Sequence, residues 1–288
     1  MEAYIDLHAH STFSDGTCSP KELVNLAADI GLKAIALTDH DTINGIPEAM
    51  LQGEKKQIEV VAGIEFSTNF IGHEIHVLGY DIPYDNPSFI KQLDSFMDSR
   101  TRRDKEMVKK LQQHGIDISL NALKKAFPNA VITRANFARY MLDHGYISSI
   151  SEAFDKYIGD SGPCFVEREK ISPTQAVTLI IENGGIPVLA HPLLYHLSED
   201  DLYKLTRQMK EAGLVGIEAI YSRNHKNDEA KMRHLAQHFG LKISGGSDFH
   251  GDNKPDIALG WGCLKENSQG NLKIPYRVLE ELRKGMVQ

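Results

Sequence analysis

The sequence predicts an α/β protein in which a β/α barrel is interrupted by an all-helical insertion. Strand-like segments alternate with amphipathic helical segments over residues 4–82 and again from residue 172 onward. Between them lies a long stretch of helical pattern without a convincing strand. Such alternation is typical of a parallel sheet covered by helices. Seven strands fit better than eight. The predicted barrel comprises residues 1–98 and 168–288, and the predicted insertion comprises residues 99–167.

The predicted elements follow from local signals in the chain. Ser19 is a suitable N-cap, Pro20 fits the first helical turn and Gly31 ends the pattern, so a helix is expected there. Comparable helical patterns occupy residues 43–56, 172–185, 198–213, 228–240 and 275–285. Apolar, β-branched runs alternate with them. The predicted strands are residues 4–9, 33–41, 58–68, 74–82, 186–192, 215–221 and 242–250.

Composition limits the class of protein and its partners. The chain has 288 residues and a formal net charge of -7, which argues against stable binding of duplex nucleic acid. No apolar run approaches the roughly 18 residues that a membrane span needs. The N-terminus has no signal-peptide pattern, and three scattered cysteines favour a reducing compartment. We therefore expect a cytoplasmic protein without a membrane partner.

Two histidines one residue apart stand at the end of the first predicted strand, in the segment YIDLHAH. Alternate side chains of a strand point the same way, so His8 and His10 should project from one face. Two imidazoles on a rigid strand suit a divalent metal ion. The pair alone is equally compatible with ordinary polar positions at a strand end, so the metal hypothesis depends on further ligands.

The other predicted strands also carry histidine, aspartate or glutamate, along the strand or directly after it. In a β/α barrel the strand ends open on one face, where active sites lie. A chance explanation would require several independent strand ends to acquire such residues for unrelated reasons. The predicted metal ligands are His8, His10, Asp15, His40, Glu65, His76, His191, Asp248 and His250.

The chemistry of these ligands predicts the kind of metal and its number. Imidazoles and carboxylates without a thiolate favour Mn, Fe or Zn over Ca or Mg. One ion needs only three or four protein ligands, so this set predicts two or three divalent ions, with Glu65 as the bridging ligand. Clustered metals generate a hydroxide at neutral pH and clamp a phosphoryl centre. The predicted reaction is attack of a metal-bridging hydroxide on phosphorus.

The segments DLHAHSTFSDG, LTDHD, GIE, HVLGY, AHP and SDFH resemble the successive motifs of the PHP (polymerase and histidinol phosphatase) family. They occur in the family's order, between residues 6 and 250. The resemblance implies a distorted seven-stranded β/α barrel, a trinuclear metal site and hydrolysis of phosphoesters. The implied ligand groups are His8, His10, Glu65 and Asp248 on one ion, Asp15, His40 and His250 on a second, and Glu65, His76 and His191 on a third.

The insertion, with the segment ITRANFARYMLDHGYISSISEAFDKYIGDSGPCFVE, is similar to the TrpH/YciV-like subgroup of this family. Members of the subgroup include phosphatases of 3′,5′-bisphosphonucleotides and 5′-to-3′ exonucleases that trim short RNA. The resemblance implies that the insertion caps the barrel and selects the substrate. The chain departs from the subgroup at Asn136, where a histidine is common, which leaves the substrate contacts of the insertion open.

Four residues outside the ligand set are candidates for binding or assisting the substrate. Arg134 stands directly before a predicted helix, where a guanidinium can hold a phosphate bidentately; a solvated arginine is the alternative. His225 follows a strand end and can contact phosphate or protonate a leaving oxygen, unless it is a surface histidine. Arg168 and Lys170 return the chain from the insertion to the barrel, and a solvated charge run is their simpler explanation.

Other polar residues are interpreted as structural or surface positions. The segment HLAQH has the spacing of a helical metal pair but lacks the glutamate of HExxH. The basic run SRTRRDKEMVKK is interpreted as the wet face of an insertion helix. Cys18 is interpreted as a packed small side chain. The histidines assigned no role are His73, His114, His144, His196, His234 and His238.

These observations predict a metal-dependent phosphoesterase of the phosphatase or exonuclease type, with Arg134 and His225 as assisting groups. The expected substrate is a phosphate monoester of a small nucleotide, such as a 3′,5′-bisphosphonucleoside, or the end of a short oligonucleotide. Histidinol phosphate or another small phosphate ester is an alternative substrate. A non-catalytic metal-binding module is an alternative of a different class. An amidohydrolase is disfavoured because no predicted strand ends in lysine.

Overall fold

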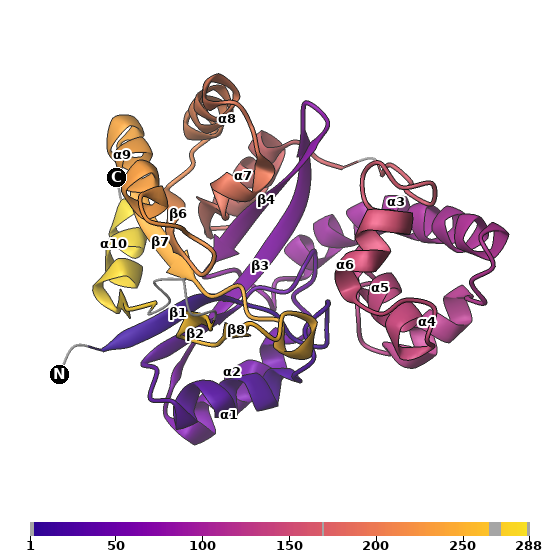
Figure 1. The fold of residues 1–288 in the computed structure, drawn as a ribbon. Coiled ribbons are helices and arrows are strands. Elements are labelled where there is room, and N and C mark those ends of the chain that lie inside the picture. Colours follow the sequence, from indigo (N-terminus) through magenta and orange to yellow (C-terminus); the bar gives the residue numbers. More distant parts are fainter. Residues whose placement is uncertain (1–2, 169, 265–271, 287–288) are drawn as a thin grey trace.

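The barrel sheet contains all the predicted strands and confirms the predicted fold class (Figure 1). A computed structural model describes residues 3–168, 170–264 and 272–286. The sheet has eight strands in the order β10-β1-β2-β3-β4-β5-β6-β7, and β10 is a short edge strand that the prediction did not include. Its strands are β1 (Tyr4–Ala9), β2 (Ala34–Leu37), β3 (Glu59–Phe70), β4 (His73–Tyr80), β5 (Ile186–Leu189), β6 (Gly216–Tyr221), β7 (Lys242–Gly246) and β10 (Ile274–Pro275). A separate hairpin comprises β8 (Ile257–Ala258) and β9 (Gly262–Cys263).

The barrel closes where the ends of β1 and β7 meet. The backbone N–H of Asp248 donates to the carbonyl of His8 at 2.8 Å, and the N–H of His10 donates to the carbonyl of Phe249 at 2.9 Å. This approach requires a glycine on β7, because a Cβ at Gly246 would lie 2.2 Å from the Cβ of His8. The closure therefore brings the first and last predicted metal-binding segments side by side.

The sheet is not parallel throughout, which corrects the expected arrangement of βα units. The pairs β1–β2, β2–β3, β5–β6 and β6–β7 are parallel, but β3–β4 and β4–β5 are antiparallel. The reason is the short connection between β3 and β4, which consists of Ile71 and Gly72, both with positive φ. Two residues can join antiparallel strands, whereas a parallel crossover needs a dozen or more.

Helices cover the outside of the barrel, and α1 (Pro20–Asp29) begins after the predicted N-cap Ser19. Ser19 and Glu22 form a capping box at the start of α1, and Ser172 and Gln175 form another at the start of α7 (Pro173–Glu182). Buried residues of these helices and of alternate strand positions form one apolar cluster outside the sheet. The helices around the barrel are α1 (Pro20–Asp29), α2 (Ile46–Lys56), α7 (Pro173–Glu182), α8 (Glu199–Glu211), α9 (Asp228–Phe239) and α10 (Arg277–Gly285), with 3-10 turns at Pro192–Tyr195 and Gly251–Asn253.

The last helix, α10, lies at the end of the barrel where the parallel strands begin. Its apolar residues join the other alternate set of strand residues in a second buried cluster. Arg283 on α10 pairs with Glu59 at the start of β3 at 2.8 Å and with Asp81 directly after β4 at 2.8 Å. This end of the barrel is therefore closed, and the opposite rim is the end where a reactive site can lie.

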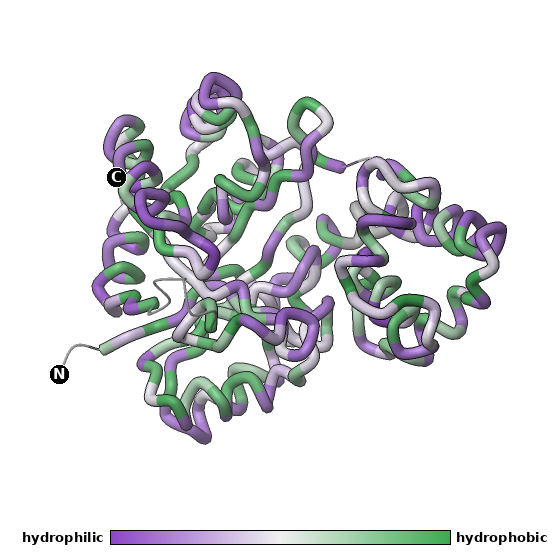
Figure 2. Tube along the Cα trace, viewed as in Figure 1, coloured by the Kyte–Doolittle hydropathy of each residue, from purple (hydrophilic) through white to green (hydrophobic). Residues whose placement is uncertain are grey.

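The insertion is a helical lobe beside the barrel (Figures 1 and 2). Its buried apolar side chains form a core of their own. The helix α3 runs without a break through the predicted boundary at residue 98. Phe89 and Leu93 on this helix pack in the barrel cluster, whereas Met107 and Leu111 pack in the core of the lobe. The helices of this region are α3 (Pro87–Gln113), α4 (Leu120–Ala126), α5 (Arg134–Asp143), α6 (Ile150–Ala153) and the π-helical turn η1 (Phe154–Ile158).

No helix within the described residues combines the length and the apolar character that crossing a membrane requires.

Candidate metal centre

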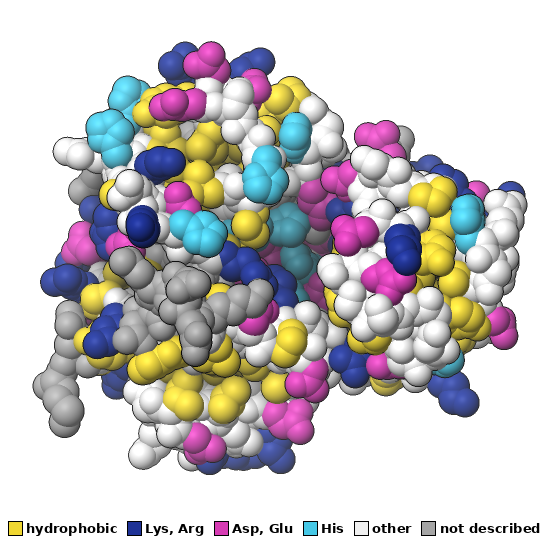
Figure 3. All heavy atoms as spheres, viewed as in Figure 1, with side chains coloured by type: hydrophobic (Ala, Val, Ile, Leu, Met, Phe, Trp, Pro, Cys, Tyr) yellow, Lys and Arg dark blue, Asp and Glu magenta, His cyan; other side chains and the backbone are white. Residues whose placement is uncertain are grey.

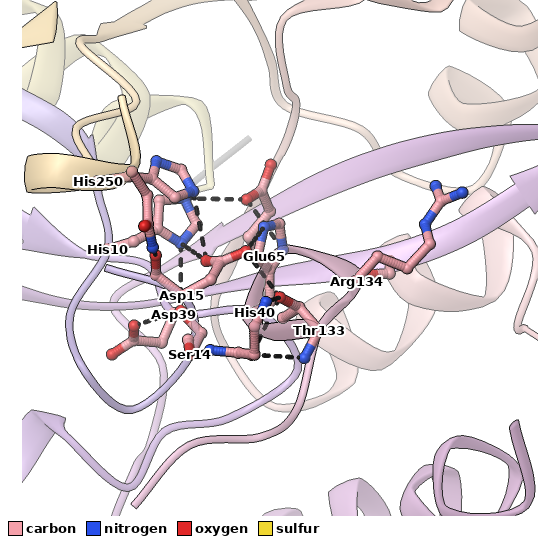
Figure 4. Close-up of polar contacts among 12 residues, drawn as sticks. His10, Ser14, Asp15, Asp39, His40, Glu65, Thr133, Arg134 and His250 are labelled. Atoms are coloured by element: carbon pink, nitrogen blue, oxygen red, sulfur yellow. Dashed lines mark hydrogen bonds and ion pairs between the residues drawn. The ribbon is translucent and has the colours of Figure 1, made fainter. Parts of the chain in front are cut away.

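The structure brings all the predicted ligand residues together in one cluster at the open rim of the barrel. Figure 4 shows His10, Asp15, His40, Glu65 and His250 in this cluster. All are buried except His76, which is half-buried. His76 lies near the start of its strand, not at its end. It reaches the same rim because β4 runs antiparallel to β3, so that its first residues lie where the parallel strands finish.

Glu65 is the centre of the cluster, as expected for a bridging residue on a central strand. Its Oε2 lies 3.3 Å from Nε2 of His8, 3.2 Å from Nε2 of His10 and 3.2 Å from Nδ1 of His40. Its Oε1 lies 2.9 Å from Nδ1 of His76 and 3.0 Å from Nε2 of His191. One buried carboxylate therefore faces imidazoles from both sides, which is the arrangement that a bridging metal ligand needs.

Asp15 reaches the cluster from the loop after β1, which folds back tightly on itself. Asp39 holds this loop by accepting hydrogen bonds from the Ser11 N–H at 2.8 Å and the Ser14 hydroxyl at 2.6 Å. A Cβ at Gly16 would lie 2.2 Å from the carbonyl oxygen of His10, so the fold of this loop requires glycine there. These contacts place Oδ1 of Asp15 within 3.3 Å of His250.

Asp248 presents only one of its oxygens to the cluster. Its Oδ1 lies 3.5 Å from His10 and 3.3 Å from His250. Its Oδ2 accepts hydrogen bonds from Tyr221 at 2.8 Å and Lys254 at 2.6 Å. The residue has a positive φ of 57°, a strained conformation for a non-glycine residue. Two outer partners thus fix the direction of this carboxylate.

Among the residues that the structure describes, the candidate ligand atoms fall into four overlapping groups, each of which could hold an ion. The expected group of Asp15, His40 and His250 is contained in one of them, together with His10. Of the expected first group, His8, His10 and Asp248 lie together without Glu65. His76 and His191, which were expected to share one ion with Glu65, each join Glu65 in a separate group. The groups are His10, Asp15, His40 and His250; His8, Glu65 and His191; His8, His10 and Asp248; and His40, Glu65 and His76.

Buried ligand atoms without hydrogen-bond partners indicate that the cluster is built for cations. Such orphaned polar atoms are costly unless a ligand or ion satisfies them. Most of them point at the same small space as the Glu65 carboxylate. Among the described residues, the orphaned atoms of the cluster include Nε2 of His8, Nε2 of His10, Oδ1 of Asp15, Nδ1 of His40, Oε2 of Glu65, Nδ1 of His76 and Nδ1 of His191. Imidazole nitrogens and carboxylate oxygens of this kind fit divalent transition metals.

The electrostatics of the protein alone keep the carboxylates ionised. Burial opposes the charge of Glu65, but the neighbouring His8 and His76 hold its pKa well below its usual range. Burial alone would lower the pKa of His76, but Glu65 and Glu74 raise it to about 10. In the same way, burial opposes the charge of Asp15, but His40, His250 and His10 together outweigh burial and hold the pKa of Asp15 well below its usual range. These carboxylates are therefore available as anionic ligands.

Two glutamates that were not among the predicted site residues contact the cluster from outside. Glu218 on β6 contacts Nδ1 of His8 at 3.0 Å and accepts the backbone N–H of His191 at 2.8 Å. Glu74 contacts Nε2 of His76 at 3.1 Å. Carboxylates that hold the outer nitrogen of a ligating histidine orient its ring. A charged residue inside the apolar strand VGIEAIY was the available signal for Glu218.

A cavity of about 160 Å³ opens beside the cluster toward the insertion, and three of the predicted substrate-binding residues line it. Its walls include Asp15, His40 and His76 from the cluster. Its cationic lining residues are Arg100, Arg103, Arg134, Arg168 and Lys170. Figure 3 shows histidine side chains at the floor of the hollow between the barrel and the lobe, with basic and acidic groups around them. The site therefore combines a metal-competent floor with basic walls.

The interpretation of the basic run as a solvent-exposed helix face is wrong for Arg100 and Arg103. Both are buried, with 4% and 8% exposure. Their guanidinium groups donate to the carbonyl of Ile132 at 2.8 and 3.0 Å. Arg100 also pairs with Asp41, which Arg168 contacts at 3.3 Å. These contacts join the outgoing and returning segments of the insertion to the barrel rim.

His225 does not share the position of the other predicted substrate-binding residues. Its side chain is exposed before α9, and its backbone N–H donates to Asp228 at 2.9 Å. Within the described residues, it does not line the 160 Å³ cavity and belongs to none of the four candidate metal groups. The loop after β6 therefore turns this histidine toward solvent.

Asn136 has a local structural role at the start of α5. It forms a capping box with Thr133, whose hydroxyl also donates to Asp15 at 3.0 Å. The amide of Asn136 donates to the carbonyl of Ser14 at 3.0 Å. The start of α5 is thus fastened to the loop that carries Asp15, which places Arg134 at the mouth of the site.

Comparisons with known proteins agree with this geometry. The family model of the PHP domain matches residues 6–159. The chain is 37% identical over 267 residues to a 5′-3′ exoribonuclease of Haemophilus influenzae, covering 93% of this chain and 95% of that protein. It is 32% identical over 249 residues to a 3′,5′-nucleoside bisphosphate phosphatase of Chromobacterium violaceum, covering 86% of this chain and 87% of that protein.

Solved structures of similar proteins share the fold over almost the whole chain. A Chromobacterium violaceum protein, named an amidohydrolase and solved with bound sulfate and no metal, has a TM-score of 0.84 and 30% identity. The alignment covers 98% of this chain and 97% of that one. A Bifidobacterium adolescentis protein, provisionally named a metal-dependent phosphoesterase, has a TM-score of 0.85 and 25% identity, with 98% and 96% coverage.

The fold and the cluster together define a hydrolase of the metal-dependent barrel class. The chain belongs to the PHP domain family. It is a phosphoesterase whose activity depends on divalent metals.

Proposed function

We propose that this protein hydrolyses a phosphate monoester of a small nucleotide, of the 3′,5′-bisphosphonucleoside type, or the end of a short oligonucleotide. One observation carries the proposal: the basic cavity of about 160 Å³ opens directly on a cluster built for divalent cations. A phosphate in this cavity would meet cations on both sides. Such an arrangement stabilises the charge that develops during phosphoryl transfer.

The proposal assigns two or three divalent ions to the cluster, with Mn preferred and Fe or Zn as alternatives. The ligands would be His8, His10, Asp15, His40, Glu65, His76, His191, Asp248 and His250. The orphaned buried nitrogens and oxygens support this assignment. When bound, such ions supply Lewis acidity and a nucleophilic water at neutral pH.

The protein's own side chains would bind and orient the substrate. Arg134, Arg168 and Lys170 line the cavity and would hold phosphate oxygens by charge-assisted hydrogen bonds. Arg134 is held in place by Asp160 at 2.5 Å and by the faces of Phe154 and Phe165. The exposure of His225 gives it at most a role at the outer edge of a longer substrate.

The insertion would act as the substrate cap in this proposal, with the barrel formed by residues 1–98 and 168–288 and the cap by residues 99–167. The apolar core of the insertion and its contact with the barrel through Arg100 and Asp41 support this division of the chain into barrel and cap. The names of the exoribonuclease and bisphosphate phosphatase relatives support a nucleotide substrate. Scattered cysteines support the cytoplasm as the location, and the negative net charge argues against duplex nucleic acid as a partner.

A turnover screen tests the proposal. The purified protein is loaded with Mn and assayed for phosphate release from a 3′,5′-bisphosphonucleoside, a short oligoribonucleotide, a nucleoside 5′-monophosphate and histidinol phosphate. We expect the bisphosphonucleoside or the oligonucleotide to give the highest kcat/KM. Preference for histidinol phosphate would establish the alternative substrate class, and absence of turnover on all of these substrates with metal bound would refute the proposed substrate.

A further inference from the structure

Glu74 lies at the junction of the metal-competent cluster and the basic cavity. It precedes His76 by two residues on β4, so both side chains project from the same face of the strand. Glu74 lines the cavity of about 160 Å³ beside the cluster. It also lines a second cavity of about 260 Å³ that shares Arg134 and Lys170 with the first. The residue therefore stands in the wall between the two spaces.

The two oxygens of Glu74 contact groups with different tasks. Oε1 lies 3.1 Å from Nε2 of His76, whose Nδ1 faces Glu65 at 2.9 Å. Oε2 accepts a hydrogen bond from Arg134 at 3.2 Å and another from Lys170. One carboxylate thus connects a candidate metal ligand with two cations of the phosphate-binding wall.

The contact with His76 determines which ring nitrogen can bind a metal. A carboxylate beside Nε2 holds a proton on that nitrogen, so a metal ion that replaces one proton of the imidazolium would bind at Nδ1, which faces Glu65. Nδ1 of His76 is one of the buried atoms without a hydrogen-bond partner among the described residues. Glu74 therefore orients the imidazole for coordination without lying in the cluster itself.

The contacts with Lys170 and Arg134 place a negative charge among the cations that would bind phosphate. The carboxylate side chain of Glu74 is 29% exposed and that of Lys170 is 13% exposed. An incoming phosphate must therefore share these cations with the Glu74 carboxylate.

We propose that Glu74 is a positioning residue for both halves of the site: it orients His76 toward the metal and holds Lys170 and Arg134 toward the substrate, in competition with the substrate's phosphate. This inference rests on the proposed function, because it assumes that the cluster binds metal and that the cavity binds phosphate. It deepens that function by assigning a residue that tunes metal retention and anion affinity in opposite directions.

The variant Glu74→Gln tests this inference because it removes the charge and keeps the shape. We expect a roughly 10- to 100-fold loss of metal affinity at the weakest site, as for other carboxylates behind a ligating histidine. We also expect roughly two- to fivefold tighter binding of inorganic phosphate at saturating Mn, since the cations lose a competing ion pair. Metal equivalents per chain after dialysis and calorimetry with inorganic phosphate give the two readouts.

Two further variants separate the halves of the inference. Lys170→Gln should weaken phosphate binding and leave the retained metal unchanged, because Oε1 of Glu74 still contacts His76. Glu167→Gln is the matched control: its exposed side chain lines only the outer 260 Å³ cavity, and it should alter neither readout. Circular dichroism melts confirm that each variant is folded.

The outcomes distinguish this inference from the proposed function. Loss of metal with a gain in phosphate affinity in Glu74→Gln, absent in Glu167→Gln, supports the inference. Unchanged metal retention or unchanged phosphate affinity in Glu74→Gln overturns it, while wild-type protein that binds both leaves the proposed function standing. Wild-type protein that retains no metal and binds no phosphate refutes the proposed function, and the inference with it.

Discussion

His76 and Glu65 lie 2.9 Å apart although their strands run in opposite directions. The hairpin between β3 and β4 places the first half of β4 at the rim where the parallel strands end. An imidazole can therefore join the cluster from the beginning of its strand. The same hairpin brings Glu74 to the wall of the cavity. One antiparallel strand thus supplies both a candidate ligand and the residue behind it.

Replacing Glu65 by glutamine should disable the site. The change keeps the shape but removes the negative charge that faces imidazoles on both sides, so metal retention should fall. We expect kcat/KM to decrease by roughly 10²- to 10³-fold or more, the effect of losing a central electrostatic group. Phosphate release and metal equivalents per chain are the measurements.

The control for this change lies on the same strand. Glu59 begins β3 at the closed end of the barrel, where it pairs with Arg283 at 2.8 Å. Glu59→Gln should therefore leave metal content and turnover at wild-type values. If Glu65→Gln matched Glu59→Gln in both measurements, the cluster would not be the reactive centre.

Removal of divalent ions should abolish turnover, and Mn should restore it. Chelation leaves the buried ligand atoms unsatisfied, so the midpoint of thermal unfolding should also fall. At a free metal concentration of about 100 times Kd, one bound ion stabilises the folded state by about 2.7 kcal/mol. A fluorescence melt with and without Mn measures the shift.

Asp248→Ala and His8→Ala are the companions to this experiment. Each should reduce turnover by orders of magnitude, remain folded and lose most of the Mn-dependent rise in melting temperature. Full activity in a chelated wild-type sample would contradict metal dependence. An unchanged Mn response in both variants would exclude these residues from the ligand set.

Arg134 should be required for substrate binding more than for stability. It lies at the start of α5, lines the cavity and is held by Asp160 and Glu74. We expect Arg134→Met to lower kcat/KM by roughly 10- to 100-fold, the worth of a hydrogen bond to a charged group. The assay is initial-rate kinetics with the best substrate of the screen.

Arg139 provides a comparison on the same helix. It forms an i,i+4 ion pair with Asp143 at 2.9 Å, away from the cavity lining. Arg139→Met should change kcat/KM by less than about twofold, since such surface pairs contribute little. Equal losses in the two variants would mean that Arg134 acts on the helix and not on the substrate.

The strand ends were predictable because their residue types and alternation carry the signal. His8, His10 and Glu65 lie on apolar strands, where burying a polar side chain is costly unless it has a partner or a bound ion. The closure of the barrel brings these residues together. The direction of β4 was not predictable from the same pattern, because period-two alternation is identical in parallel and antiparallel strands. The available signal was the gap of five residues between the predicted strands 58–68 and 74–82, which is too short for a parallel crossover.

The supporting groups were harder to predict than the ligands. Glu218 is buried and Glu74 is half-buried, both on strands. Sequence alone does not say whether such a charge binds an ion or orients a neighbour. Arg100 and Arg103 looked like a solvated helix face because their shared partner, the carbonyl of Ile132, is remote in the chain. His225 followed the strand-end rule, but its loop turns outward.

Asp41 should link the stability of the protein to pH through the contacts between insertion and barrel. Its carboxylate pairs with Arg100 and Arg168 and accepts the backbone N–H of Ser67 at 2.9 Å. Burial opposes the charge of Asp41, but the two guanidinium groups outweigh it and lower its pKa from 3.8 to about 2. A lowered pKa in the folded state means that the stabilisation is complete above the unfolded-state value and disappears as pH falls through the folded-state value.

We therefore expect Asp41→Asn to reduce the free energy of unfolding by about 2 kcal/mol above about pH 5. The difference from wild type should shrink between about pH 4 and pH 2, because Asp41 becomes protonated in the folded wild-type protein over that range. Urea unfolding of both proteins at a series of pH values measures this difference in the free energy of unfolding. Asp143→Asn, which breaks only a surface pair, should cost less than about 1 kcal/mol at every pH. A difference between wild type and Asp41→Asn that is independent of pH down to pH 2 would show that the stabilisation comes from packing and not from the charge of this carboxylate.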